Sequence, residues 1–358
     1  MPETRLTFDD LLAQLAAHAQ QVDIECTWPT WQVGQLAAAG VLQWSIPAEF
    51  GGAPATADVL LAGYVRLARA CLTTTFILTQ RNGACQRIAD SANEPLRAKL
   101  LPALACGDLW ATVGISHLST SRQHQGTPAV RVEKRGSGYC FSGAVPWVTG
   151  AAHADYIVTG GTLADGRQVL AAIPARQPRV RIHAAMSLLA LTASHTAEVE
   201  LDAVEIDERE LLAGPTEQIM QAGSSGGAGS LATSALAIGA AQMTLERLHH
   251  EASARLELLE VQASLAEECA QIERDLYQVL SSGATGQTAG EIRARANSLV
   301  LRSSQALLAA SKGAGFVAGH PAGRAVREAL FFLVWSCPQP VLAASLREFA
   351  GSAAPQQF

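Results

Sequence analysis

The feature that most constrains the fold of this chain is that its pattern of apolar and β-forming residues changes twice along the sequence. Up to about residue 108, apolar side chains recur at helical spacing, as in Leu11, Leu12 and Leu15. Residues 109–214 consist mainly of short β-rich or alternating runs, and after Pro215 the chain reads as helical again. Helices followed by strands and then by helices predict an α+β protein with segregated layers.

The three segments predict three domains, which are an N-terminal helical domain (1–108), a middle β-barrel (109–214) and a C-terminal helical bundle (215–358). In the first domain the clearest helical segments are Asp58–Ala70 and Glu94–Leu104. In the second, glycines and a proline separate evenly spaced strand-like runs at 130–133, 139–142, 156–159, 169–173 and 197–201. Short strands of even spacing are typical of a small barrel or sandwich.

The third segment contains a long stretch, Ala240–Leu280, with neither glycine nor proline. A bundle needs a turn within it, and the turn is expected at His249–Ser253, where the sequence is least apolar. Gly283–Gly290 is expected to be a loop, followed by a helix over Glu291–Ser311. Because this segment is rich in Ala and Leu and has few charges, one of its faces is expected to pack against another subunit in a homodimer or homotetramer.

Composition excludes several classes of protein. Hydrophobic residues make up 49% of the chain, which argues against general disorder, and the net charge of −6 leaves no basic footprint for nucleic acid. The seven cysteines are dispersed without a C-x-x-C pair, which indicates reduced thiols in a cytoplasmic protein. No apolar run reaches the roughly 18 residues of a membrane span, and the first residues lack the apolar core of a secretory signal.

Five strings resemble segments of the acyl-CoA dehydrogenases, and they occur in the same order over nearly the whole chain. They are AGVLQWSIPAEFGG (39–52), LRAKLLPALACGD (96–108), GYCFSGAVPWVTG (138–150), EVELDAVEIDERELLAGP (198–215) and GAGFVAGHPAGRAVREA (313–329). The resemblance implies the same three domains, usually assembled as dimers or tetramers. It also implies FAD between barrel and bundle, with the adenosine end reaching the neighbouring subunit.

The family reaction needs a carboxylate base that removes the α-proton of an acyl thioester. Counting from Arg327, Glu328 and Ala329, the position of the usual glutamate is taken by Ser336. Some relatives carry the glutamate at the start of the first bundle helix instead, and that position falls on Gly229. Both usual sites of the base therefore lack a carboxylate, and the catalytic residue stays unknown.

The resemblance implies that several residues contact a flavin. Trp147, Val148 and Thr149 match the segment whose Trp packs on the isoalloxazine and whose Thr bonds its edge, although a Trp of the barrel core is the alternative. The remaining contacts implied by the resemblance are Ser116, Arg255, Gly313 and Gly315.

The diphosphate side of this predicted site differs from the family pattern. Arg255 matches a diphosphate anchor, but the Phe-Gly turn that should follow it is missing, and a solvated helix residue is an equal alternative. His117 stands at a Glu position of the family, where a hydrogen-bonded structural residue is favoured over a catalyst and no metal site is indicated. The Gly-rich stretch 223–230 reads as a linker rather than a phosphate loop. A flavin is therefore expected to bind weakly, with FMN competing with FAD or no flavin bound at all.

Three functions remain open at this point. The first is a flavin-dependent oxidoreductase that does not perform ordinary α,β-dehydrogenation, since relatives with oxygen chemistry need no α-proton base. The second is an ordinary acyl-CoA dehydrogenase with a relocated base, such as Glu328 or a glutamate of the bundle. The third is a non-catalytic relative that has lost FAD. In the first two cases a small-molecule substrate is expected, possibly an acyl-CoA thioester.

Overall fold

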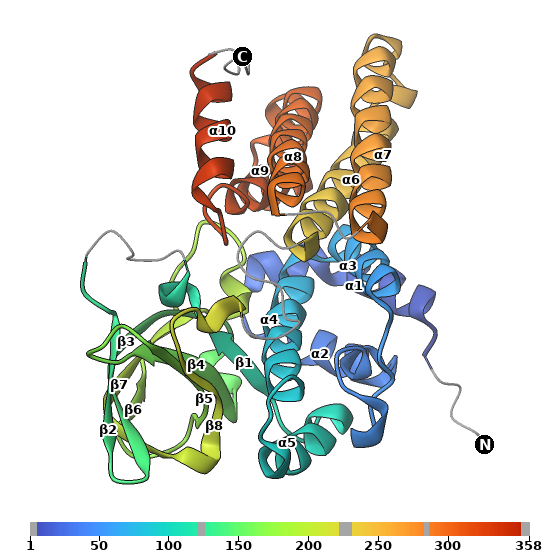
Figure 1. Cartoon of the computed structure of the whole chain (residues 1–358). Coiled ribbons are helices and arrows are strands. Elements are labelled where there is room, and N and C mark those ends of the chain that lie inside the picture. Colours follow the sequence, from blue (N-terminus) through green and yellow to red (C-terminus); the bar gives the residue numbers. More distant parts are fainter. Residues whose placement is uncertain (1–5, 120–125, 222–230, 283–285, 352–358) are drawn as a thin grey trace, which may run out of the picture.

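The computed structural model describes residues 6–119, 126–221, 231–282 and 286–351. Helices come first, a sheet lies in the middle, and helices follow again, as Figure 1 shows from blue to red. The predicted α+β architecture is confirmed. Within the described residues, none of the helices combines the length and the apolar character needed to cross a membrane.

The N-terminal layer is built from helices whose ends are set by local hydrogen bonds. They are α1 (Phe8–Glu25), α2 (Thr30–Ala38), α3 (Ala57–Ala70), α4 (Leu72–Ala89) and α5 (Glu94–Cys106). The Thr7 side chain accepts a hydrogen bond from the Asp10 N–H at the start of α1. Gly107 ends α5 with a φ of 85°, a left-handed conformation that glycine adopts without strain. Helix α4 is the most buried of the layer and contacts α3, α6 and the sheet (Figure 1).

In the middle segment, the described residues form a curled sheet of eight strands (Figure 1). The strands are β1 (Ala111–Gly114), β2 (Val130–Arg135), β3 (Gly138–Val148), β4 (Tyr156–Thr162), β5 (Gln168–Pro174), β6 (Val180–Ile182), β7 (Ala197–Asp207) and β8 (Leu211–Thr216). Their order is β6-β7-β3-β2-β4-β5-β8, and β1 pairs with β4 in parallel. The long hairpin-like pairs β2–β3 and β4–β5, and the pair β3–β7, are antiparallel.

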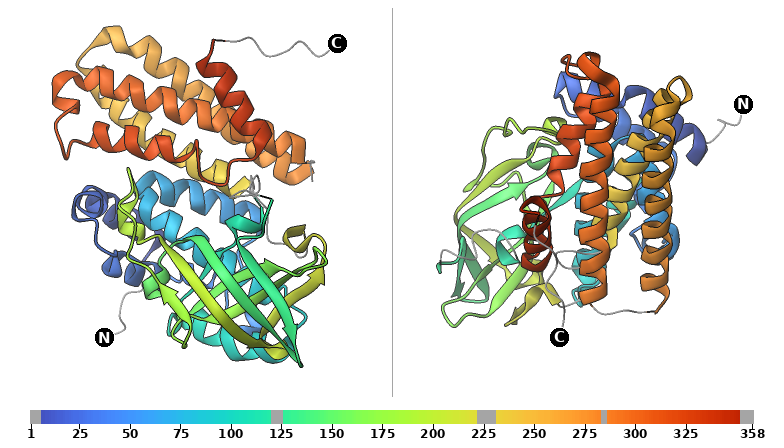
Figure 2. Two further views of the ribbon diagram at one scale, coloured as in Figure 1. Left: turned by 90° about the vertical axis from the view of Figure 1, so that its left-hand side faces the viewer. Right: turned by 90° about the horizontal axis from the view of Figure 1, so that it is seen from above.

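The C-terminal segment is a bundle in which three long helices lie together (Figure 2). Its helices are α6 (Leu231–Ser253), α7 (Leu259–Ser282), α8 (Gly286–Gly315), α9 (Pro321–Phe331) and α10 (Gln339–Phe349). The turn expected at His249–Ser253 is misplaced, because α6 continues through Ser253 with Leu248 and Ala252 buried. The loop expected at Gly283–Gly290 is also wrong from Gly286 on, where α8 has already begun.

The bundle is joined to the N-terminal layer by a close contact between α3 and α6. A Cβ atom at Gly239 of α6 would lie 2.2 Å from the backbone oxygen of Val65 and 3.0 Å from the backbone nitrogen of Arg69. Only a residue without a side chain allows the two helices this approach. One apolar cluster accordingly runs through α1, α3 and α4, the sheet and the bundle. This continuous core fixes the sheet and the bundle relative to each other.

Candidate functional site

The end of β3 carries the residues with the strongest predicted flavin role. Val148 is fully buried, whereas the side chain of Trp147 is 48% exposed on the opposite face of the strand. The alternative of a Trp in the barrel core is therefore wrong. A large indole surface left uncovered by the described residues fits a partner that stacks on it.

Thr149 belongs to a buried chain of hydroxyl groups. Its Oγ1 lies 3.2 Å from Thr196 Oγ1, which in turn lies 2.9 Å from Ser194 Oγ. The Thr149 carbonyl accepts a hydrogen bond of 2.7 Å from Thr112 Oγ1 on β1. If each hydroxyl donates along the chain from Ser194 to Thr149, the Thr149 proton remains available for an acceptor outside the network. In that direction the Thr149 hydroxyl group can donate one further hydrogen bond.

Ser116 lies beside the same end of the sheet. It begins a short 3-10 helix, Ser116–Leu118, that follows β1 and contacts β3. Its neighbour His117 is buried, and His117 Nε2 donates to the Gly160 carbonyl at 2.9 Å, since a carbonyl oxygen can only accept. This bond agrees with a structural role for His117. The structure thus brings Ser116, Thr149 and the β1–β3 contact into one region.

The predicted diphosphate residues form a second group at the end of the bundle. Arg255 follows α6, and its Nη2 donates to Glu251 Oε2 at 2.6 Å and to the Ala310 carbonyl at 2.7 Å. It is therefore a partly buried link between α6 and α8 rather than a solvated helix residue. Ala310 lies one turn before Gly313 and Gly315, so Arg255 is close to that end of α8. Among the described contacts, none joins this group to the residues on the sheet within one chain.

Position 336 lies in the break between α9 and α10. Ser336 has a φ of 45°, the left-handed region that favours glycine. Its neighbour Trp335 stacks on Phe331, and the Trp335 carbonyl accepts a hydrogen bond of 3.1 Å from Arg293 Nη2. Gly229, the other predicted position of the base, lies outside the described residues.

The surroundings of Ser336 contain a buried cation that sequence reasoning missed. Arg293 on α8 is fully buried, and burial lowers the pKa of its guanidinium to about 9. Its planar group lies over the rings of Phe332 and Trp335, at 5.5 and 5.8 Å from their centroids. Burial raises the pKa of the nearby Cys337 thiol, so the thiol form is favoured over a nucleophilic thiolate.

Glu328, the alternative base, is enclosed between α9 and its neighbours. Burial raises the pKa of its carboxyl group, and Arg324 on the same helix lies 3.8 Å from it. The next residue, Arg327, is bound to Asp23 of α1 through two hydrogen bonds. Glu328 is thus part of a charged cluster that connects α9 to the rest of the chain.

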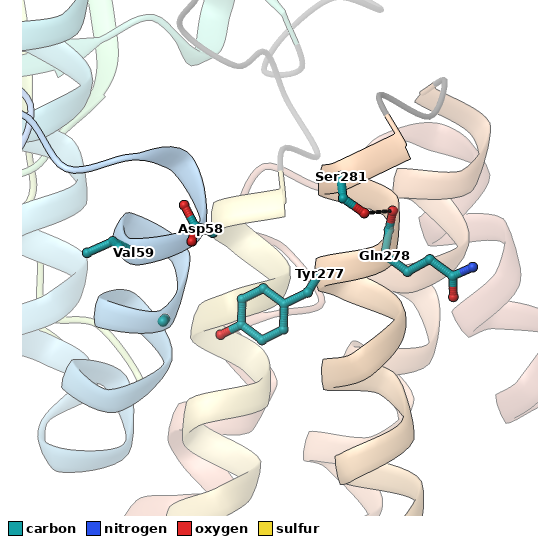
Figure 3. A pocket seen from close by; sticks show the side chains of 6 residues that line it. Asp58, Val59, Tyr277, Gln278 and Ser281 are labelled. Atoms are coloured by element: carbon teal, nitrogen blue, oxygen red, sulfur yellow. Dashed lines mark hydrogen bonds between the residues drawn. The ribbon is translucent and has the colours of Figure 1, made fainter.

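A separate cleft of about 600 Å³ lies between α3 and α7 (Figure 3). The residues lining it are Asp58, Val59, Ala62, Tyr277, Gln278 and Ser281. Burial raises the pKa of Tyr277, and Ser281 Oγ donates to the Gln278 carbonyl. None of the residues with a predicted flavin role lines this cleft.

Comparison with known proteins shows what the chain is similar to. Residues 4–108 match the N-terminal domain of acyl-CoA dehydrogenases. The probable acyl-CoA dehydrogenase YngJ of Bacillus subtilis (strain 168) is 25% identical over 240 residues, which span 65% of this chain but only 63% of that relative. The chain is therefore similar in sequence to acyl-CoA dehydrogenases.

Solved structures of acyl-CoA dehydrogenase type share the fold over nearly the full length. A glutaryl-coenzyme A dehydrogenase in complex with glutaryl-CoA has a TM-score of 0.82 at 18% identity, covering 96% of this chain and 95% of its own. The prolyl acyl carrier protein oxidase AnaB has a TM-score of 0.79 at 16% identity, covering 96% and 98%. This chain therefore shares the fold of both structures.

Proposed function

We propose that this protein is a flavin-dependent oxidoreductase that does not perform ordinary α,β-dehydrogenation of acyl-CoA thioesters. The observation that carries the proposal is the setting of Ser336, which offers a hydroxyl group where the family reaction needs a carboxylate. A serine hydroxyl does not remove an α-proton at neutral pH without an activating base. Arg293, which donates to the carbonyl of the preceding residue Trp335, is a cation and does not activate a hydroxyl as a base does.

The proposal gives Glu328 a structural role instead of that of a relocated base. A base must reach the reacting carbon and accept its proton, whereas the Glu328 carboxylate faces Arg324 inside the bundle. Removing it would leave the cation of Arg324 without its carboxylate. The charged cluster it shares with Asp23 and Arg327 is sufficient reason for a buried acid at this position.

The residues on the sheet fit the isoalloxazine end of FAD better than the residues of the bundle fit its diphosphate. Trp147 offers an uncovered ring face, and Thr149 and Ser116 carry hydroxyl groups on the neighbouring segments. Arg255, in contrast, already binds Glu251 and the Ala310 carbonyl. When bound, FAD supplies the two-electron redox chemistry. The residues named here would hold and orient its ring.

A reaction with oxygen as the electron acceptor fits this site, because it requires no α-proton base. The similarity of fold to an acyl carrier protein oxidase supports this reading. A non-catalytic role is the second candidate, and it is favoured by the engagement of Arg255 within its own chain. A measurement of flavin binding distinguishes the enzymatic candidate from the non-catalytic one, since a protein without a flavin site has no redox chemistry to perform.

Assembly into a homodimer or homotetramer is part of the proposal. Apolar side chains of the bundle and its connections are exposed in the single chain, and they include Leu256, Phe316, Val317, Val334 and Phe349. Phe316 is 86% exposed in the turn that follows Gly315. Exposed apolar groups of this size are typical of surfaces that pack against another chain.

The test starts with the purified full-length protein and its absorbance at the flavin bands. Apo-protein is titrated with FAD and with FMN, using Trp147→Ala as the binding-site variant and Trp31→Ala, an exposed Trp of α2, as the matched control. We expect flavin binding that Trp147→Ala weakens and Trp31→Ala leaves unchanged. Protein that binds neither flavin would overturn the enzymatic proposal in favour of the non-catalytic one.

A further inference from the structure

The cleft between α3 and α7 combines apolar surface with a carboxylate. Val59, Ala62 and the ring of Tyr277 supply the apolar part, and Asp58 supplies the negative charge. Among the described residues that line the cleft, none is Lys, Arg or His. Its volume of about 600 Å³ lies within the range of pockets that hold small molecules, roughly 300–1,000 Å³. The cleft therefore has the size and the charge to receive a small cation with an apolar body.

Tyr277 extends from one wall of the cleft toward the other. Its ring reaches from α7 toward α3, where Asp58 lies in the first turn of the helix (Figure 3). The ring is half-buried and packs against the hydrophobic core, whereas Asp58 is exposed. A tyrosine attracts an ammonium group through the face of its ring, and its hydroxyl oxygen accepts a hydrogen bond from that group.

The electrostatics of Tyr277 indicate that two carboxylates act on its hydroxyl group. Burial raises the pKa of Tyr277, and the negative charges of Glu273 and Asp58 raise it further. Glu273 lies one turn before Tyr277 on α7, and burial raises the pKa of its carboxyl group as well. A cation bound next to Tyr277 would be attracted by both carboxylates.

The cation that acts on this part of the protein is already engaged in an ion pair. Arg69 of α3 lowers the pKa of Glu273, but its guanidinium is paired with Glu246 of α6. The hydrogen bonds that lower the pKa of Asp58 come from neutral groups, namely the Thr56 side chain and backbone N–H groups. Asp58 is therefore ionised at neutral pH and offers its charge to a ligand in the cleft.

We propose that the cleft between α3 and α7 binds a small alkylammonium ion, with its charged head against Asp58 and Tyr277 and its apolar tail along Ala62. None of the residues with a predicted flavin role lines this cleft, so the inference does not rest on the proposed function. The charge of the head determines which molecules bind. Hexylammonium should bind best, hexan-1-ol with the same tail more weakly, and hexanoate least, because Asp58 and Glu273 repel a carboxylate.

The test observes Tyr277 directly by fluorine NMR of the full-length protein labelled with fluorotyrosine. The chain contains four tyrosines, and the Tyr277→Phe variant identifies the resonance of Tyr277. Titration with hexylammonium chloride should shift this resonance until it saturates. Hexan-1-ol should shift it with lower affinity, and hexanoate should leave it unchanged. The affinity for alkylammonium ions should rise by up to about fourfold for each further methylene group that becomes buried.

Variants of the lining residues separate binding in the cleft from a general effect of charge. Asp58→Asn should weaken the binding of hexylammonium by up to about fivefold, as expected for the loss of an exposed ion pair. Asp10→Asn is the matched control, since Asp10 also lies in the first turn of a helix and accepts a hydrogen bond from the N-cap residue Thr7. Ala62→Leu fills the cleft and should abolish binding without removing a charge.

Three results would overturn the inference. The first is a Tyr277 resonance that does not respond to hexylammonium, and the second is equal affinity for hexylammonium and hexan-1-ol. The third is hexylammonium binding that Asp58→Asn changes no more than Asp10→Asn does, or that Ala62→Leu leaves intact.

Discussion

Replacing Gly239 by alanine should destabilise the protein even though alanine favours helices. In an exposed helix the change gains up to about 1 kcal/mol. At Gly239 the new methyl group would lie 2.2 Å from the Val65 oxygen and 2.8 Å from Ala68 Cβ, and the first of these atoms belongs to the backbone. Overpacking costs about 1–3 kcal/mol, and a backbone clash belongs at the upper end of this range. The expected net loss is roughly 2 kcal/mol.

Gly34→Ala is the matched control, because Gly34 lies in α2 with nothing within 4 Å of its added Cβ. It should raise stability by up to about 1 kcal/mol, so the two variants should differ in sign. Thermal midpoints recorded by circular dichroism should fall by about 3 °C for Gly239→Ala and rise slightly for Gly34→Ala. A midpoint for Gly239→Ala at or above that of the unmodified protein would refute the close approach of α3 and α6.

Three further predictions concern titration, assembly and the cofactor. Burial and the neighbouring His195 lower the pKa of His153 below 6.5, so the unfolded chain takes up this proton first and stability is lost as pH falls below about 6.5. His153→Phe keeps a ring against Trp28 and should flatten the dependence of the thermal midpoint on pH over this window; an unchanged slope would count against it. Light scattering should give the mass of a dimer or tetramer at working concentration, and a strict monomer would contradict the assembly proposal. FMN should compete with FAD, because one lost charge-assisted bond to a diphosphate costs about 1.5–3 kcal/mol; nanomolar FAD binding without FMN binding would show an intact diphosphate site.

Much of the fold could be predicted because local patterns and long-range packing agree. The helical spacing of Leu11 and Leu15 and the alternation over residues 197–201 in β7 both match what the folded chain buries. The loop expected from Gly286 to Gly290 failed for a physical reason, since Gly290 lies in open space and the residues after it are strong helix formers. A glycine that a helix tolerates at little cost in stability does not end that helix.

The site was less accessible to sequence reasoning than the fold. Matching the sequence to acyl-CoA dehydrogenase segments identified Ser336, Trp147 and Thr149 as candidates. The exposure of Trp147 could not be predicted in this way, because it depends on which face of β3 packs inward. The contacts among Phe76, Arg293 and Trp335 could not be predicted, because only the packing of α4, α8 and the end of α9 brings these residues together. A buried arginine has no signature in sequence that separates it from a solvated one.

The central claim is tested most directly by the rate at which acyl-CoA substrates reduce an artificial electron acceptor through the FAD-loaded protein. General-base catalysis contributes about 10²–10⁴-fold, so the unmodified protein should fall below a typical family turnover by at least that factor. Ser336→Ala should leave this residual rate unchanged, because the hydroxyl group contributes nothing as a base. Reduction at an ordinary enzymatic turnover in the unmodified protein would contradict the account and would require a base elsewhere in the chain.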